Sequence, residues 1–252
     1  MIIDCHAHLY YDEILKDIDN VLERAVNAGI EKIIVPSVDL KTAEQILFLA
    51  DKYSMIYAAV GFHPCDIAGF NPEDVRLLEN FIKHPKVLAI GEIGLDYFWD
   101  TSYIDKQKAF FKEQIDFAKS INLPVIIHTR NSVKDAIEII KGNIKNLSGQ
   151  FHCFSGDEND LKNILAFENF YISFCGNITF KKFSENKIIE LIPVEKLLSE
   201  TDSPFLSPEP FRGKTNEPSR VIYTLNKIAE IKKCNYEEMI KIIYENNTKL
   251  FF

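Results

Sequence analysis

The chain has 252 residues, of which 46% are hydrophobic and 26% are charged, and it contains 10 Gly and 10 Pro. This composition excludes a disordered, collagen-like or low-complexity protein, and no apolar run approaches the roughly 20 residues that a membrane helix needs. Lys and Arg total 29 against 37 Asp and Glu, so the formal net charge of −8 argues against a protein that grips long nucleic acid with a basic surface.

The start of the chain and its cysteines bear on the compartment. Residues Met1–His6 have neither the basic region nor the apolar region of a signal peptide, which predicts a cytoplasmic protein. The five cysteines are odd in number and form no Cys-x-x-Cys pair, which argues against a disulfide framework or a structural zinc ribbon. We therefore expect free thiols, and nothing in the sequence indicates a membrane or an obligate protein partner.

Short runs of apolar and β-branched residues alternate along the chain with amphipathic stretches of helical length. The predicted strands are Met1–Asp4, Lys32–Val38, Ile56–Val60, Val87–Ile90, Pro124–Ile127, Gln150–His152, Phe170–Phe174 and Lys196–Ser199. The predicted helices are Asp12–Ala28, Thr42–Tyr53, Pro72–Lys83, Tyr103–Asn122, Val133–Lys141, Glu158–Phe167, Ser184–Leu191, Pro218–Lys232 and Tyr236–Leu250.

Local signals mark the ends of several predicted helices. Asn71 precedes Pro72 and two acidic residues, which predicts a capped helix N-terminus. Thr101 and Ser102 predict a hydroxyl cap for the long helix that follows them. Gly29 stands where a glycine is expected after a helix C-terminus.

Eight strand–helix units in one chain indicate a parallel sheet. Strands that are apolar at consecutive positions, such as Pro124–Ile127, suit burial on both faces of that sheet. Eight units in about 250 residues fit an α/β fold of the (β/α)8 TIM-barrel type, with one extra C-terminal helix. We expect residues 1–252 to form a single barrel domain, and an open doubly wound sheet is the alternative.

Polar residues follow six of the predicted strands, where a barrel of this kind carries its catalytic residues. Five of the six histidines lie there, all but His84. His6 and His8 are two residues apart on one strand, so their side chains point the same way and can reach one cation. The candidate ligands at these strand ends are His6, His8, Glu92, His128, His152 and Asp202.

Imidazole nitrogen with carboxylate oxygen suits zinc, manganese, cobalt or iron, whereas magnesium prefers oxygen alone. Four histidines and two carboxylates are too many ligands for one four-coordinate ion and about right for two ions bridged by a carboxylate. Taken singly, a strand-end histidine is usually a satisfied polar residue, Glu92 suits a salt bridge and Asp202 suits a turn. So many polar groups after apolar strands favour the metal site. His63 is assigned to the surroundings of that site or to a phosphate, and His84 to neither.

The strand-end motifs together resemble those of the TatD-related metal-dependent deoxyribonucleases of the amidohydrolase superfamily, and the resemblance covers essentially the whole chain. The motifs read DCHAHL, GFHP, GEIGLDY, PVIIHTR, HCFSG, ETDSPFL and RGKTNEP, the last at Arg212–Pro218. The resemblance implies a TIM-type barrel with a two-metal site.

Carried over residue by residue, the resemblance gives each candidate a role. It implies that His6 and His8 bind the first ion together with Asp202, which also acts in catalysis. It implies that Glu92 bridges both ions and that His128 and His152 bind the second. His63 and Arg130 resemble the family's substrate-binding positions.

Two positions depart from the family pattern. Asn131 follows Arg130 where the family often has an acid, and Thr215 stands where a second basic residue is common. Neither is a candidate ligand, so the departures put substrate preference in question and leave hydrolysis in place.

The sequence predicts a metal-dependent phosphodiester hydrolase, a DNase or exonuclease that acts on single-stranded DNA or on DNA ends. Two divalent ions would activate the attacking water, and their identity (Zn, Mn, Ni, Co or Mg) stays open. The alternative is a metal-dependent amidohydrolase or ester hydrolase, including one that cleaves an aminoacyl-tRNA ester. Glu92 occupies the place where some amidohydrolases carry a carbamylated lysine, which favours phosphate chemistry. A barrel without catalysis would have a broken ligand set, and all six candidates are present.

Aromatic residues stand near the same strand ends. They suit stacking on an unpaired base, and packing within the loops is an equal alternative. They are Phe62, Tyr97, Phe98, Trp99 and Phe154.

Overall fold

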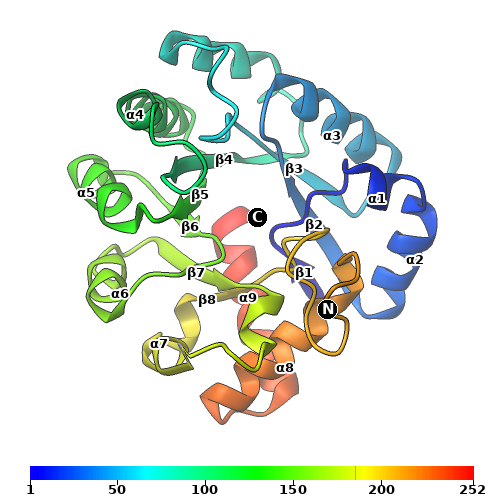
Figure 1. Ribbon diagram of the computed structural model, residues 1–252. Helices are drawn as coiled ribbons and strands as arrows, with labels where there is room; N and C mark the ends of the chain where they lie inside the picture. Colours follow the sequence, from blue (N-terminus) through cyan, green and yellow to red (C-terminus); the bar gives the residue numbers. More distant parts are fainter. Residues whose placement is uncertain (185) are drawn as a thin grey trace.

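Eight parallel strands form a ring that is surrounded by helices in the computed structural model, which describes residues 1–184 and 186–252 (Figure 1). The strands lie in chain order, and each pairs in parallel with the next. They are β1 (Ile2–Asp4), β2 (Ile30–Pro36), β3 (Ile56–Val60), β4 (Val87–Asp96), β5 (Val125–Arg130), β6 (Gly149–Phe151), β7 (Phe170–Phe174) and β8 (Leu197–Ser199). The predicted TIM-type barrel is confirmed, since a doubly wound sheet would reverse its strand order at a switch point.

The ring is nearly closed by the segments that follow β1 and β8. The backbone N–H of Cys5 donates to the carbonyl of Ser199 at 3.4 Å, and that of Asp202 donates to the carbonyl of His6 at 2.9 Å. An isolated parallel bridge joins Ala7 to Ser203. Closure at this point brings the first and last strand-end motifs of the chain side by side.

Helices and short 3-10 turns (written η) connect the strands on the outside of the ring. The α-helices are α1 (Asp12–Leu15), α2 (Ile18–Asn27), α3 (Leu40–Lys52), α4 (Ile104–Ser120), α5 (Val133–Asn143), α6 (Glu158–Leu165), α7 (Asn186–Leu191), α8 (Val221–Lys232) and α9 (Tyr236–Phe251). The 3-10 turns are η1 (Pro72–Asn80), η2 (Gly176–Thr179), η3 (Val194–Lys196) and η4 (Pro218–Arg220). Residue 185, inside the predicted helix Ser184–Leu191, is outside the described residues. No helix in the described part of the chain has the length and apolar character needed to cross a membrane.

Several predicted helices differ from the structure, and the predicted helix Pro218–Lys232 begins as the 3-10 turn η4 before α8. The first helix, predicted at Asp12–Ala28, is two helices separated at Lys16 and Asp17, and the segment predicted as a helix at Pro72–Lys83 is the 3-10 turn η1. The hydroxyl cap before α4 is wrong, because Tyr103 precedes the helix and no side chain caps it.

Two of the local signals were correct. The capping box of Asn71 is present at the start of η1. Gly29 follows α2 with φ of +85°, a left-handed conformation that glycine adopts without strain.

The C-terminal helix closes one end of the barrel. Leu250 and Phe251 cluster with the buried Cys5, Ile34 and Leu198 of the barrel interior, and Figure 1 shows the C-terminus at the centre of the ring. The ring of Phe252 packs on Tyr57 and Lys32, near the starts of β3 and β2. The amino ends of the strands are therefore covered, and the carboxyl ends remain open for a site.

Candidate metal centre

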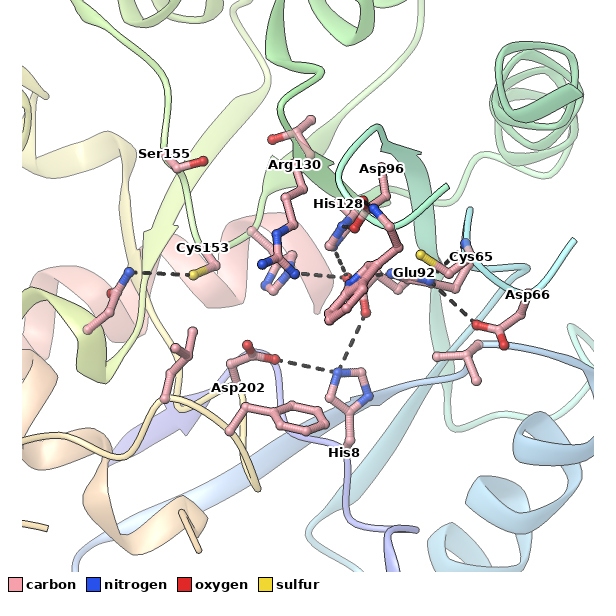
Figure 2. Close-up of a pocket in the computed structure, with 18 of the residues that line it drawn as sticks. His8, Cys65, Asp66, Glu92, Asp96, His128, Arg130, Cys153, Ser155 and Asp202 are labelled. Atoms are coloured by element: carbon pink, nitrogen blue, oxygen red, sulfur yellow. Dashed lines mark hydrogen bonds and ion pairs between the residues drawn. The ribbon is translucent and has the colours of Figure 1, made fainter. Parts of the chain in front are cut away.

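A pocket of about 630 Å³ opens at the carboxyl ends of the strands. We call it the central pocket. Figure 2 shows that polar side chains from several strands point into it. Its walls include His8, His63, Glu92, His128, His152 and Asp202. Convergence of titratable groups in one concave site is typical of an active site.

His6 and His8 follow β1 and present their Nε2 atoms to each other at 3.2 Å. The extended chain places the two rings on the same side, as their spacing predicts. Nδ1 of His8 is hydrogen-bonded to the buried hydroxyl of Tyr10 at 2.9 Å, which leaves Nε2 directed inward. Asp202 completes this group, with Oδ1 at 3.5 Å from Nε2 of His8 and 3.8 Å from Nε2 of His6.

Glu92 lies inside β4, which is longer than the predicted strand and continues to Asp96. The extension pairs with β5, with Gly94 opposite His128. Gly94 has φ of +140°, and a Cβ there would meet the carbonyl oxygen of His128 at 2.1 Å, so only glycine lets the two strands pass this closely.

The two carboxylate oxygens of Glu92 face different groups of histidines. Oε2 lies 3.3 Å from Nε2 of His6 and 3.6 Å from Nε2 of His8. Oε1 lies 2.8 Å from Nδ1 of His128 and 3.1 Å from Nε2 of His152. Glu92 is thus buried between two sets of donor atoms, and the rings of His6 and His152 stack where the sets meet, with 3.9 Å between centroids.

Two further acids contact His128 and His152 through the ring nitrogens that do not face Glu92. Oδ2 of Asp96 lies 2.9 Å from Nε2 of His128, and Oε1 of Glu200 lies 3.1 Å from Nδ1 of His152. Glu200 is fully buried, and its Oε1 also accepts the backbone N–H of Cys153 at 2.7 Å. Such contacts fix which ring nitrogen of a histidine is available to a ligand.

Sequence reasoning assigned no role to Asp96 or Glu200, although both stand in the polar stretches after β4 and β8. The available signal was spacing, since Asp96 is four residues after Glu92 and Glu200 is two residues before Asp202. Alternation along an extended chain places residues at even spacing on one face.

The electrostatics of the pocket keep the carboxylates of Glu92 and Asp202 ionised. Burial would raise the pKa of the Glu92 carboxyl, but His152 and His6 hold that pKa well below its ordinary value. Burial would also raise the pKa of Asp202, and the hydrogen bond from His8 lowers it below its ordinary value. Burial lowers the pKa of His6, which favours the neutral imidazole that binds metals.

These donor groups fit divalent cations. Within the described residues, four groups have donor atoms that all lie within 4.8 Å of one another, and three of them are in the histidine cluster: His6–His8–Glu92, His6–His152–Asp202 and His63–Glu92–His128. The fourth is Cys153–Cys175–Glu200. Nδ1 of His6 is buried and has no hydrogen-bond partner among the residues that the structure describes, so the polar contacts of this ring are made through Nε2, inside the cluster. Imidazole nitrogen mixed with carboxylate oxygen is the donor set of zinc, manganese and cobalt sites.

His63 and Arg130, the predicted substrate-binding residues, both line the central pocket. Nε2 of His63 lies 3.7 Å from Oε1 of Glu92, which puts it among the possible metal donors as well. The guanidinium of Arg130 lies 3.7 Å from the ring centroid of Phe98 and 5.2 Å from that of Trp99.

The aromatic residues near the strand ends differ in exposure. Tyr97 is half-buried, and its hydroxyl donates to Oδ2 of Asp135 at 2.9 Å. Phe62 and Phe154 are buried, so packing explains them and base stacking does not. Phe98 and Trp99 are exposed by 52% and 69%, and Trp99 lines the central pocket.

His84 lies outside the central pocket, where its Nε2 contacts Oδ1 of Asp51 at 3.0 Å. We expect His84→Ala to retain activity within about twofold, since the lost contact is an exposed pair that stabilises the fold by at most about 1 kcal/mol. Steady-state kinetics with a thermal melt checks this. A large loss of kcat in a variant that melts normally would contradict the assignment.

The chain matches the family model described as TatD related DNase over residues 3–252. It is 42% identical to an uncharacterized metal-dependent hydrolase of Bacillus subtilis, YabD, over 100% of this chain and 99% of that protein. It is 31% identical to the uncharacterized metal-dependent hydrolase YcfH of Escherichia coli K12, over 99% of this chain and 95% of that protein.

Solved structures agree with these sequence matches. The crystal structure of YjjV, a TatD homologue from Escherichia coli K12, superposes with a TM-score of 0.94 at 30% identity and covers 99% of this chain and 97% of its own. A TatD family hydrolase from Entamoeba histolytica gives a TM-score of 0.85 at 26% identity and covers 100% and 98%. An uncharacterized amidohydrolase from Saccharomyces cerevisiae, at 18% identity and a TM-score of 0.88, shares the fold and covers 99% of each chain.

Proposed function

This chain is a metal-dependent hydrolase that belongs to the family of TatD-related DNases, and we propose that it hydrolyses phosphodiester bonds of DNA at single strands or strand ends. The observation that carries the proposal is the position of Glu92 between two sets of donor atoms, one on each carboxylate oxygen. A pair of cations that shares one carboxylate is the arrangement used for in-line displacement at phosphorus.

In this proposal the first ion would be held by His6, His8 and Asp202, and the second by His128 and His152, with Glu92 shared. Two divalent ions supply charge stabilisation for the phosphoryl oxygens and lower the pKa of water toward about 7. Asp96 and Glu200 orient His128 and His152 through the ring nitrogens that do not face Glu92.

The protein's own side chains then carry the proton and hold the substrate. Asp202 is the ionised carboxylate at the edge of the pocket, so it would orient the attacking water and accept its proton. The Arg130 guanidinium would donate to non-bridging phosphate oxygens, with His63 as a second contact. Trp99 beside it is exposed enough to stack on an unpaired base.

Carbonyl chemistry is the rival, because the same barrel can hold a metal-dependent amidohydrolase. Glu92 occupies the place where some amidohydrolases carry a carbamylated lysine, and a carboxylate in that place favours the phosphodiester. The overall charge of −8 also favours a short grip on a strand end over a long duplex groove.

Parallel assays test the proposal. The chelated and desalted protein is reloaded with Zn, Mn, Co, Ni or Mg and given end-labelled single-stranded and duplex DNA, a cyclic amide and an aminoacyl ester. We expect divalent ions to restore stepwise shortening of single-stranded DNA, with little turnover of the other substrates. Hydrolysis of the amide or the aminoacyl ester without any cleavage of DNA would overturn the proposal.

A further inference from the structure

A second hollow of about 470 Å³ adjoins the central pocket. We call it the side cleft. Phe205 and Leu206 line both hollows, so they form the partition between them. The remaining walls of the side cleft include Glu13, Phe180, Arg212, Lys214 and Thr215. A chain that leaves the central pocket over this partition enters the side cleft directly.

The side cleft carries positive charge on a protein that is acidic overall. Arg212 and Lys214 are exposed cations on its wall, and Glu13 is the acid that lines it. Among the residues that the structure describes, neither cation has a carboxylate oxygen within 4.0 Å. The Arg212 guanidinium lies instead 4.5 Å from the ring centroid of Phe180.

Arg212 and Lys214 lie in the loop 200–217 between β8 and η4, and other residues hold this loop in place. The side-chain amide of Asn216 donates to the carbonyls of Thr201 and Phe205 at 2.9 and 2.8 Å. Glu217 accepts from Arg24 at 2.7 and 2.9 Å. The loop is therefore fixed on the barrel without help from Arg212 or Lys214.

Arg220, in the 3-10 turn η4 that follows this loop, differs from Arg212 and Lys214. Its Nη1 donates to Oγ of Ser207 at 2.7 Å and to the carbonyl of Thr215, so this cation has structural partners. Arg212 and Lys214 are exposed and, among the described residues, have no ion-pair partner, while the backbone that carries them is held in place. Cations without an internal partner are free to pair with an anion, and a backbone already held in place does not have to be ordered when the anion binds.

The partition itself suits a nucleotide. Phe205 is 47% exposed, and its ring meets Tyr11 edge-to-face at 5.3 Å between centroids and His8 at 6.1 Å. An aromatic face of this kind can stack on a base of any sequence. A base on Phe205 would separate one phosphate in the central pocket from the next phosphates in the side cleft.

We propose that the side cleft is a second phosphate-binding subsite, in which Arg212 and Lys214 hold the backbone of a polynucleotide whose reacting phosphodiester lies in the central pocket. This inference rests on the proposed function and refines it. It makes a strand with several phosphates a better substrate than a dinucleotide, which has one phosphodiester and none left for the cleft.

The test compares two substrates that differ in the number of phosphates, thymidylyl-thymidine and an oligothymidylate eight nucleotides long. For the Arg212→Ala/Lys214→Ala double variant we expect kcat/KM on the oligothymidylate to fall about tenfold, through KM, because two charge-assisted contacts are lost. Cleavage of the dinucleotide should keep the wild-type rate. The slope of log(kcat/KM) against log[salt] should become shallower by about 1.4 on the longer substrate.

A matched control removes the same charge from the opposite end of the barrel. Lys83 and Lys145 are exposed in the connections that precede β4 and β6. Lys83→Ala/Lys145→Ala should therefore behave as the wild type on both substrates. An equal loss in this control would assign the effect to net charge and overturn the subsite.

The remaining outcomes separate the subsite from the proposed function. Wild-type salt dependence and kcat/KM of the Arg212→Ala/Lys214→Ala variant on the oligothymidylate would overturn the subsite alone. A wild-type enzyme that cleaves neither substrate with any cation would overturn the proposed function, and the subsite with it.

Discussion

Replacement of Glu92 by glutamine is expected to leave a folded protein that binds metal weakly and turns over at least about 10²–10³-fold more slowly than the wild type. Glu92 is the carboxylate that contacts both groups of histidines, at 3.3 Å to His6 and 2.8 Å to His128. The glutamine amide has one acceptor oxygen, so its NH₂ end faces one of the two groups with a donor. That group loses a ligand atom, and the other group faces a neutral amide oxygen in place of a carboxylate, so both halves of the centre lose affinity for cations.

The measurement includes a readout that does not depend on turnover. A cation present at 100 times its dissociation constant stabilises the folded state by about 2.7 kcal/mol. For a chain of this size that stabilisation raises Tm by roughly 5–10 °C. We expect Mn²⁺ to give this shift in the wild type and almost none in Glu92→Gln.

A matched control makes the same change on the surface. Glu138 is exposed on α5, where it pairs with Lys141 at 3.8 Å, so Glu138→Gln should retain both the shift in Tm and the turnover. Full Mn²⁺-dependent turnover of Glu92→Gln would show that Glu92 does not have the role proposed for it.

The barrel and the positions of its strands follow from local information. Apolar runs such as Val125–Ile127 are buried as the pattern predicts, and the strand-end histidines reach one pocket because parallel strands end on the same side of a sheet. The resemblance of the motifs to one family is confirmed by the family model and by the structural match.

The errors and omissions come from interactions between distant parts of the chain. β4 continues past Ile90 because Gly94 pairs with His128 of β5. This pairing depends on the close approach of the β5 backbone to Gly94, and a glycine by itself is not a local signal for a strand. The contacts of Asp96 with His128 and of Glu200 with His152 span 32 and 48 residues. Their partners are set by strand register, which the sequence pattern does not contain.

Asp202 is expected to have a different role from Glu92, because its ion-pair contacts are with His6 and His8, whereas Glu92 also contacts His128 and His152. Its Oδ1 lies 3.5 Å from His8 and 3.8 Å from His6, and its side chain retains slight exposure toward the pocket. Its backbone has φ of +53°, a left-handed conformation that asparagine adopts more readily than most residues. Asparagine therefore preserves the loop and its backbone hydrogen bond to His6 while removing the carboxylate.

Asp202→Asn is accordingly expected to lower kcat by about 10²–10⁴-fold, the range for loss of a general base, even when cations are saturating. Elemental analysis should find that it retains about half of the cations that the wild type binds, whereas Glu92→Gln loses most of both. Asp116→Asn, an exposed change on α4, should match the wild type in both measurements. Wild-type kcat in Asp202→Asn would exclude this carboxylate as the proton acceptor, because the amide of asparagine cannot take up a proton from water.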